Sequence, residues 1–315
     1  MNILDQIPFL KRNQSSSPAG GKFVIAHWDR DTVSYLIATS TQRPLRDNEF
    51  GLLSLIPPSP ADSAGSTPEE PKRLPPLVVL ASHLEEQGIT VNRLAVLLSR
   101  PELDQLSLSL PPASQDELPR LVLSEVEQQQ GEVADPPVVD YLIINENAGA
   151  LPPEEKGGGT GPQVLAFALS QRQLELLQQE ASTAGFKLIA IGSRQLAPLR
   201  LLPREGISSG GLAISIHLLS GEAEVAICRG REPVLLRSIR YSNEDAERVA
   251  EQIDTEANRC LTLLPESFSQ LPVTWYIYET GEFARRVAKA VEEQEPEKVR
   301  LVDPASDWKI GRAHV

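Results

Sequence analysis

A strand–turn–strand unit that leads through a third strand into a helix occurs twice in this sequence, and it constrains the fold more than any other feature. The first copy spans about residues 23–87 and the second about 212–264. In each copy the first strand reaches a histidine, His27 or His217, shortly before a turn. A different α/β block separates the copies. This pattern predicts a duplicated α/β fold with an insertion, whose two similar lobes face each other across a cleft.

The size and charge of the chain agree with a duplicated fold and exclude some functions. The 315 residues correspond to about two typical domains. The 43 acidic and 30 basic side chains give a net charge of -13, which counts against nucleic-acid binding. Two cysteines are too few for a disulfide framework or a zinc cluster, so we expect a reducing, cytoplasmic compartment. No apolar stretch is long enough to predict a signal sequence or a membrane span.

Proline is unusually frequent: it makes up 26 of the 315 residues, about 8%, whereas the usual share is about 5%. Much of it falls in residues 57–76 and 152–162, which we interpret as solvated loops. Residues 1–21, rich in Ser and Gly near their end, are expected to form a disordered arm.

Three sequence signals predict where helices begin. Ser114 with Glu117, and Ser170 with Gln173, form capping boxes. Ser242 is predicted to cap a long helix. One face of that helix carries apolar side chains at helical spacing, namely Ala246, Val249, Ile253, Ala257, Cys260 and Leu264.

Several short motifs in a fixed order resemble a known family. They are Leu110-Pro111, Ser114, Glu117-Leu118, Glu125, Glu127, Asp140-Tyr141, Ala184-Gly185-Phe186-Lys187, Gln195-Leu196-Ala197, Gly230 and Arg237-Ser238-Ile239. Together they resemble the PilM family of type IV pilus assembly proteins over residues 22–304. The cytoplasmic domain of GspL from type II secretion is equally similar.

The resemblance implies an actin-like, ribonuclease H-like fold with two βββαβα lobes around a nucleotide cleft. It also implies an inserted subdomain of the type found in FtsA and PilM. The last six residues match the translation of a common sequencing adapter, so we expect a truncated C-terminus and an incomplete second lobe. The expected organisation is a disordered arm (1–21), a first lobe (22–90 and 192–208), an inserted subdomain (91–191), a second lobe (209–309) and an artefactual tail (310–315).

Actin-like ATPases hold Mg-phosphate with two hairpins, each carrying an Asp and then a Gly. By strand register, the Asp positions fall on His27 and His217, and the Gly positions on Asp29 and Leu219. Neutral imidazole is a poor ligand for Mg²⁺, which prefers oxygen, and side chains at the turns obstruct the backbone. Asp29 would also repel a phosphate. A shift of one residue in this register would instead make Asp29 or Asp31 a ligand.

We therefore expect a vestigial nucleotide cleft and no cofactor, with ATP and Mg²⁺ bound only if the cleft still works. The candidate cleft residues are His27, Asp29, His217, Ser220, Gly221 and Gly281.

Other candidate sites are weaker. The two histidines would need a third ligand to hold a transition metal, and none is evident. Cys228 and Cys260 fit core positions. Residues 209–211 are glycine-rich, but no Lys-Ser/Thr follows, so a linker is the better interpretation.

The resemblance implies a role in type IV pilus or type II secretion assembly, peripheral to the inner membrane through partners. Because the nucleotide motifs look degenerate, we expect a non-catalytic scaffold. In the family, the partner is the short cytoplasmic tail of a PilN-type membrane protein, bound at a groove involving the insertion. A strongly acidic chain suits a basic tail. Other pilus or secretion proteins are further expected partners. Two alternatives are an active ATPase of the same fold and a degenerate sugar-kinase or FtsA-like division protein.

Overall fold

The computed structural model describes residues 21–29, 31–38, 50–56, 73–131, 135–144, 162–200, 202, 211–219, 221–230, 232–242, 245–264, 268, 270–278, 281–294, 296 and 298–302. Residues 1–20 of the predicted arm, most of the proline-rich loop 57–76, nearly all of 152–162 and the tail 310–315 lie outside these ranges. The described residues fall into two compact units, one within 1–103, 133–140 and 169–194 and the other within 104–132, 141–168 and 195–315.

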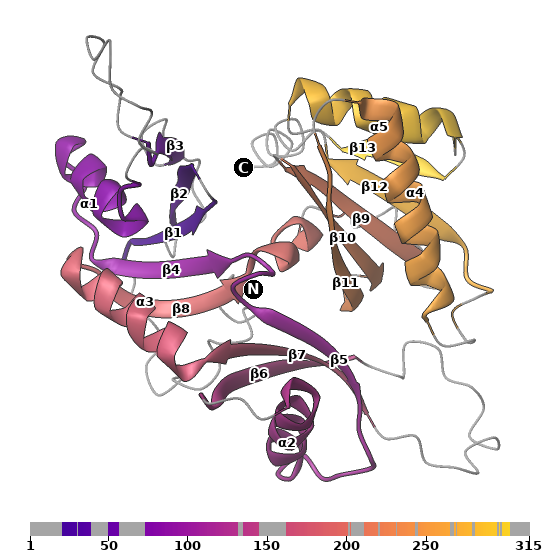
Figure 1. Cartoon of the computed structure of the whole chain (residues 1–315), viewed down its shortest axis with the longest axis horizontal. Coiled ribbons are helices and arrows are strands. Elements are labelled where there is room, and N and C mark those ends of the chain that lie inside the picture. Colours follow the sequence, from indigo (N-terminus) through magenta and orange to yellow (C-terminus); the bar gives the residue numbers. More distant parts are fainter. Residues whose placement is uncertain are drawn as a thin grey trace, which may run out of the picture. The chain divides into compact units, whose positions relative to one another are not determined.

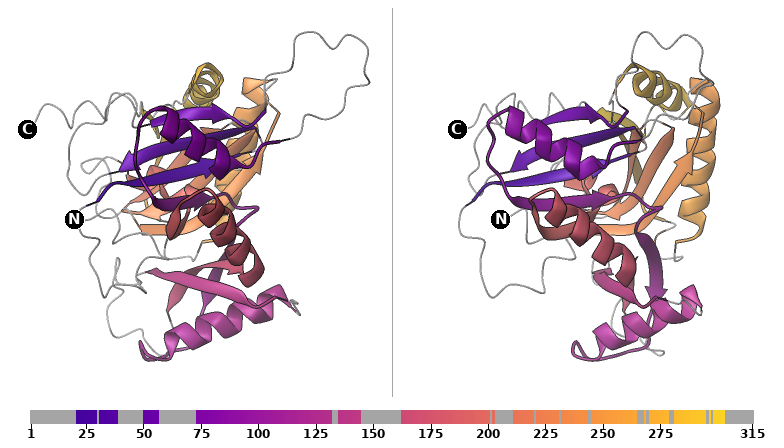
Figure 2. Two further views of the ribbon diagram at one scale, coloured as in Figure 1. Left: turned by 90° about the vertical axis from the view of Figure 1, so that its left-hand side faces the viewer. Right: turned by 60° about the vertical axis from the view of Figure 1, so that its left-hand side comes forward.

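The first unit is built on a five-stranded sheet with the order β3-β2-β1-β4-β8. β1 pairs with β2, and β2 with β3, in antiparallel fashion, whereas β1–β4 and β4–β8 are parallel. Helices α1 and α3 contact each other and pack on the sheet, and Figure 2 shows α1 lying across its indigo strands. The elements are β1 (Phe23–Trp28), β2 (Thr32–Ala38), β3 (Phe50–Ser54), α1 (Pro76–Glu86), β4 (Arg93–Leu98), α3 (Gln171–Thr183) and β8 (Lys187–Ser193).

The second unit contains a sheet of the same construction, with the order β11-β10-β9-β12-β13. Its first three strands are antiparallel neighbours, and β9–β12 and β12–β13 are parallel. Helices α4 and α5 pack together on one face of this sheet (Figure 1). The elements are β9 (Leu212–Leu219), β10 (Glu222–Arg229), β11 (Glu232–Arg240), α4 (Ala246–Thr262), β12 (Val273–Tyr278), α5 (Glu282–Gln294) and β13 (Val299–Val302).

The predicted duplication is confirmed by this shared topology. In both sheets a three-stranded antiparallel meander is followed by a helix and two parallel strands, and a second helix precedes the last strand. Parallel neighbours need a crossover, which the helices supply in each copy. The fold is therefore the actin-like duplicated α/β fold that the sequence predicts.

A third sheet, with the order β5-β7-β6, lies within the segment predicted as an insertion. It comprises β5 (Asp104–Ser109), β6 (Pro137–Ile144) and β7 (Gln163–Ser170), with α2 (Leu118–Gln130) packed beside β5. The predicted boundaries 91–191 were wrong, because β4 and β8 belong to the first sheet. The prediction that 192–208 belongs wholly to the first lobe was also wrong, because the segment from Gln195 lies in the second unit.

Two of the predicted helix starts need correction. Ser170 and Gln173 do form a complete capping box at the start of α3. The long helix α4 is capped by Asp245, whose side chain accepts from the Arg248 amide, and not by Ser242. Helix α2 begins only at Leu118, after a turn in which the Ser114 amide and hydroxyl donate to Glu117.

The core of the second unit confirms the apolar face predicted for α4 from Ala246 to Cys260, whereas Leu264 lies beyond the helix and is only partly buried. The buried positions of α4 recur at helical spacing, and they pack with β9, β10, β12 and α5 in one cluster. Each large aliphatic side chain buried this way stabilises the fold by roughly 1.5–3 kcal/mol. Within the described part of the chain, no helix combines the length and the apolar composition needed to cross a bilayer.

Candidate functional site

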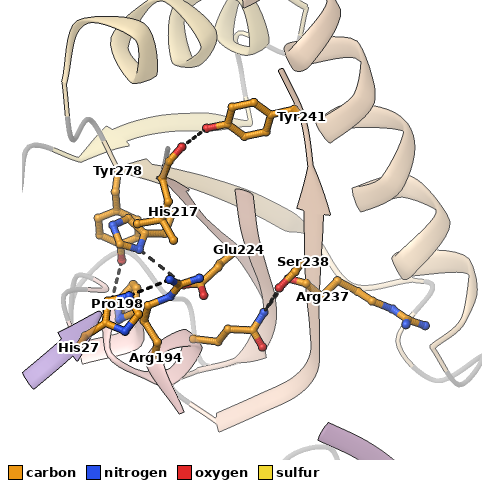
Figure 3. Close-up of polar contacts among 11 residues, drawn as sticks. His27, Arg194, Pro198, His217, Glu224, Arg237, Ser238, Tyr241 and Tyr278 are labelled. Atoms are coloured by element: carbon orange, nitrogen blue, oxygen red, sulfur yellow. Dashed lines mark hydrogen bonds and ion pairs between the residues drawn. The ribbon is translucent and has the colours of Figure 1, made fainter. Parts of the chain in front are cut away.

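His27 lies near the end of β1, where it is held on both ring nitrogens. Its Nδ1 lies 3.0 Å from the Leu97 carbonyl oxygen, and its Nε2 lies 2.9 Å from Nη1 of Arg194 (Figure 3). Because a guanidinium only donates and a carbonyl only accepts, the neutral Nδ1–H tautomer satisfies both bonds. His27 is thus a strand-end histidine with satisfied hydrogen bonds, and both nitrogens are engaged by the protein itself.

Asp29 begins the turn between β1 and β2 and organises it. Its Oδ1 accepts from the amides of Asp31 and Thr32, each at 2.9 Å, and from the Thr32 hydroxyl at 3.1 Å. Its carbonyl accepts from the Arg73 guanidinium. Partial burial raises the pKa of this carboxyl, but the hydrogen bonds from Asp31 and Thr32 outweigh that effect and lower the pKa below its usual value.

Two backbone amides of this turn are already hydrogen-bonded to a side chain of the turn itself. The corresponding turn of an actin-like ATPase presents free backbone amides to the phosphate. Here the Asp31 and Thr32 amides already donate to the Asp29 carboxylate, and that carboxylate carries the same sign of charge as a phosphate. A phosphate would have to displace this carboxylate and also overcome its repulsion.

The second hairpin joins β9 to β10, and Leu219 at the end of β9 pairs with Glu222 at the start of β10. Gly221 has φ +76°, a left-handed conformation that favours glycine. Tyr241 fastens the turn: its amide donates to the Gly221 carbonyl at 3.0 Å, and its hydroxyl donates to the Leu219 carbonyl (Figure 3). Burial, aided by Glu222, raises the pKa of Tyr241 to about 12.

His217, the counterpart of His27, lies two residues before the end of β9 and pairs with Glu224 on β10. Its Nδ1 lies 3.7 Å from Oε2 of Glu224, which is within ion-pair range when the imidazole is protonated. The Glu224 side chain is only 3% exposed. The second hairpin therefore carries a buried acidic side chain beside its histidine.

The segment that follows β8 is fixed to the second sheet. Nε2 of Gln195 donates to the Arg237 carbonyl at 2.9 Å and to the Ser238 hydroxyl at 2.8 Å. The buried Tyr278 hydroxyl donates to the Pro198 carbonyl at 2.9 Å (Figure 3). This segment therefore lies on the sheet face that carries His217 and Glu224, opposite α4 and α5.

The structure places the predicted cleft residues in two separate groups. His27 and Asp29 share the first hairpin, and His217 and Gly221 share the second, whereas Ser220 lies outside the described residues. Gly281 directly precedes α5 and its carbonyl accepts from the Arg285 amide at 2.9 Å. That these residues line one cleft remains a prediction.

Among the described residues we find neither a metal-binding cluster nor an exposed cysteine thiol. No group of three or more His, Cys, Asp or Glu side chains there is placed to hold a metal ion. Cys228 and Cys260 are buried, and burial raises the pKa of both thiols. Both therefore occupy core positions, as predicted.

Sequence reasoning did not identify Arg194, Glu224 or Tyr241 as partners of the hairpins. Arg194 lies 167 positions from His27, so no local pattern links them. Glu224 did leave a signal, because it is a lone carboxylate in the otherwise apolar strand segment Ala223–Cys228. With both nitrogens of His27 and the amides of Asp31 and Thr32 engaged, the first hairpin does not fit Mg-ATP.

No protein-family model and no curated protein matches this sequence. Solved structures share its fold. A chain of the PilM–PilN type IV pilus biogenesis complex superposes with a TM-score of 0.61 at 15% identity, covering 91% of this chain and 90% of that one.

Two other solved structures superpose with a TM-score of 0.47. One is the cytoplasmic domain of EpsL, an inner-membrane component of the Vibrio cholerae type II secretion system, at 12% identity and covering 88% of this chain and 96% of that one. The other is a Bacteroides thetaiotaomicron protein with an actin-like ATPase fold and unknown function, at 11% identity and covering 91% and 94%.

Proposed function

We propose that this chain is a non-catalytic scaffold that helps to assemble a type IV pilus or a type II secretion machine at the cytoplasmic face of the inner membrane. The assembly role is supported by the fold, which matches a chain of the PilM–PilN complex along nearly the full length of both chains. The motifs between Leu110 and Ile239 that resemble the PilM family support it from the sequence.

One observation supports the non-catalytic character: in the first turn, the amides of Asp31 and Thr32 already donate hydrogen bonds to the Asp29 carboxylate. An ATPase stabilises developing phosphate charge with donors that are free to point at it. In this chain the corresponding amide donors, of Asp31 and Thr32, are hydrogen-bonded to the carboxylate of Asp29. Two further observations support a non-catalytic role: the Arg194 guanidinium contacts His27, and Glu224 is buried at the second hairpin.

The proposed partner is the basic cytoplasmic tail of a PilN-type inner-membrane protein. The net charge of -13 favours association with a cationic segment, and such attraction weakens as salt screens it. Binding of this kind needs no nucleotide.

Calorimetric titration of a synthetic PilN-type tail peptide into the full chain tests this proposal. We expect saturable binding without nucleotide. A scrambled peptide of equal composition and charge serves as the control, since it retains the general attraction and loses the sequence match. Equal binding of both peptides, or no binding of either, would contradict the assignment.

A further inference from the structure

β3 forms one edge of the first sheet, and its sequence lacks the residues that usually prevent an edge strand from pairing with another strand. An exposed edge presents unpaired N–H and C=O groups, and proteins usually protect it with proline or charge. β3 contains neither, since it reads Phe50-Gly51-Leu52-Leu53-Ser54. Each of the other five edge strands in the described chain carries a proline or a charged residue, for example Lys187 in β8, Pro233 in β11, Arg300 in β13, Asp104 in β5 and Pro137 in β6.

Exposed apolar side chains are concentrated at this edge. Phe50 is 51% exposed and Leu52 is 68% exposed. Ile56 and Leu74 extend the apolar surface, because the Leu74 amide donates to the Leu55 carbonyl beside the end of the strand. Among the described residues, half of the exposed large hydrophobic side chains fall within residues 50–78. A concentration of this kind marks an interaction surface.

The exposed side chains lie on the sheet face away from α1. Gly51 pairs with Tyr35, whose hydroxyl lies 3.0 Å from Nε2 of His83 on α1, so this pair marks the helix-covered face. Phe50 and Leu52 alternate with Gly51 and therefore point the other way. Phe50 pairs there with the half-buried Leu36, which continues an apolar row across the sheet. The edge thus presents both backbone hydrogen-bonding groups and exposed apolar side chains to a partner strand.

We propose that β3 pairs with β3 of a second copy of this chain, antiparallel and about a twofold axis through Leu52. This pairing sets Leu52 against Leu52 and Phe50 against Ser54, so the strand complements itself in an isologous interface. Each copy has a net charge of -13, and two such chains meet with least repulsion at an uncharged strand. A basic tail would gain no electrostatic attraction from this edge. The dimer is weak, because a five-residue strand buries less surface than a standard interface.

Sedimentation velocity over a range of concentrations tests the pairing with Leu52→Lys. The wild-type chain forms a dimer that grows with concentration, and Leu52→Lys weakens association by at least about tenfold, because the dimer would bury two unpaired ammonium groups. Leu176→Lys is the matched control, since Leu176 is 55% exposed on α3 of the same unit, and it dimerises as the wild type does. A wild-type chain that stays monomeric, or a Leu52→Lys variant that dimerises normally, overturns the proposal.

A cysteine substitution tests the register. In the proposed pairing, Leu52→Cys brings two thiols within disulfide range, so mild oxidation yields a covalent dimer. The native Cys228 and Cys260 are buried and do not compete. Cross-linking of Leu52→Cys that is no faster than that of Leu176→Cys overturns the twofold axis at Leu52. Neither test involves the tail peptide, so this proposal and the proposed function stand or fall separately.

Discussion

Asp29 places a negative charge in the turn where an actin-like ATPase would need bare amides, and its own turn is organised around that charge. Three donors converge on one carboxylate oxygen. His27 is similarly committed, with one nitrogen on a main-chain carbonyl and the other on a guanidinium. At the scale of residues, the polar side chains of the first hairpin are hydrogen-bonded to the protein's own groups.

Replacing Asp29 by Ala should destabilise the fold by about 1 kcal/mol, as loss of a capping side chain does. Asp29→Asn should cost less, because its amide oxygen still accepts. The lowered pKa of Asp29 makes its contribution pH-dependent: it is present above the unfolded value near 3.8 and is lost as the pH falls through the lower folded value. Urea unfolding of the wild type and Asp29→Asn at several pH values checks this. A stability difference that stays constant down to the most acidic pH would contradict it.

Tyr241 should titrate late. Its pKa of about 12 exceeds the ordinary 10.0 because burial and Glu222 disfavour the phenolate. Its contribution to stability is therefore complete below about pH 10 and is lost as the pH rises through the folded value. The ultraviolet tyrosinate absorbance of the wild type minus that of Tyr241→Phe should isolate a transition near pH 12. A difference transition near pH 10 would contradict the fastening of the turn by this side chain.

Edge strand β3 depends on a glycine for its contact with β2. A Cβ at Gly51 would lie 2.7 Å from Cε1 of Tyr35, and that ring is buried and tied to His83. Gly51→Ala should therefore destabilise the chain by about 1–3 kcal/mol through overpacking. Thermal unfolding measures this, with the exposed position Leu176→Ala as a control expected within about 0.5 kcal/mol of wild type. Equal melting temperatures for both variants would show that the ring moves aside freely.

The start of α4 offers a test of a corrected element boundary. Asp245→Ala removes the side chain that accepts from the Arg248 amide and should cost about 1 kcal/mol. Ser242→Ala should leave stability within about 0.5 kcal/mol of wild type, because Ser242 precedes the helix. Chemical denaturation compares the two variants. The opposite ranking would restore Ser242 as the cap.

The elements were predictable from the sequence where local patterns define them. The alternation in Thr32–Ala38 and the spacing from Ala246 to Cys260 indicated a strand and a helix at the observed places. The assignment of β4 and β8 to the first sheet was not predictable, because an aliphatic run does not state which strand it will pair with. The contact of Arg194 with His27 was not predictable either, because the two residues are 167 positions apart and no local pattern links them.

At the scale of the whole molecule, the duplication explains why two histidines occupy equivalent places. Each lies near the carboxyl end of the central strand of its sheet, beside a parallel neighbour, and ligand sites of open α/β sheets form at such ends. At the end of β1, His27 is hydrogen-bonded within the first unit, and at the end of β9, His217 lies beside Glu224 within the second.

Calorimetric titration of Mg-ATP into the full chain tests this account most directly, with an actin-like ATPase as the positive control. We predict no saturable binding up to about millimolar nucleotide, because the Asp31 and Thr32 amides and both nitrogens of His27 are already hydrogen-bonded within the protein. Mg²⁺-dependent binding with a Kd in the micromolar range would contradict the account and make the chain a nucleotide-binding member of the fold.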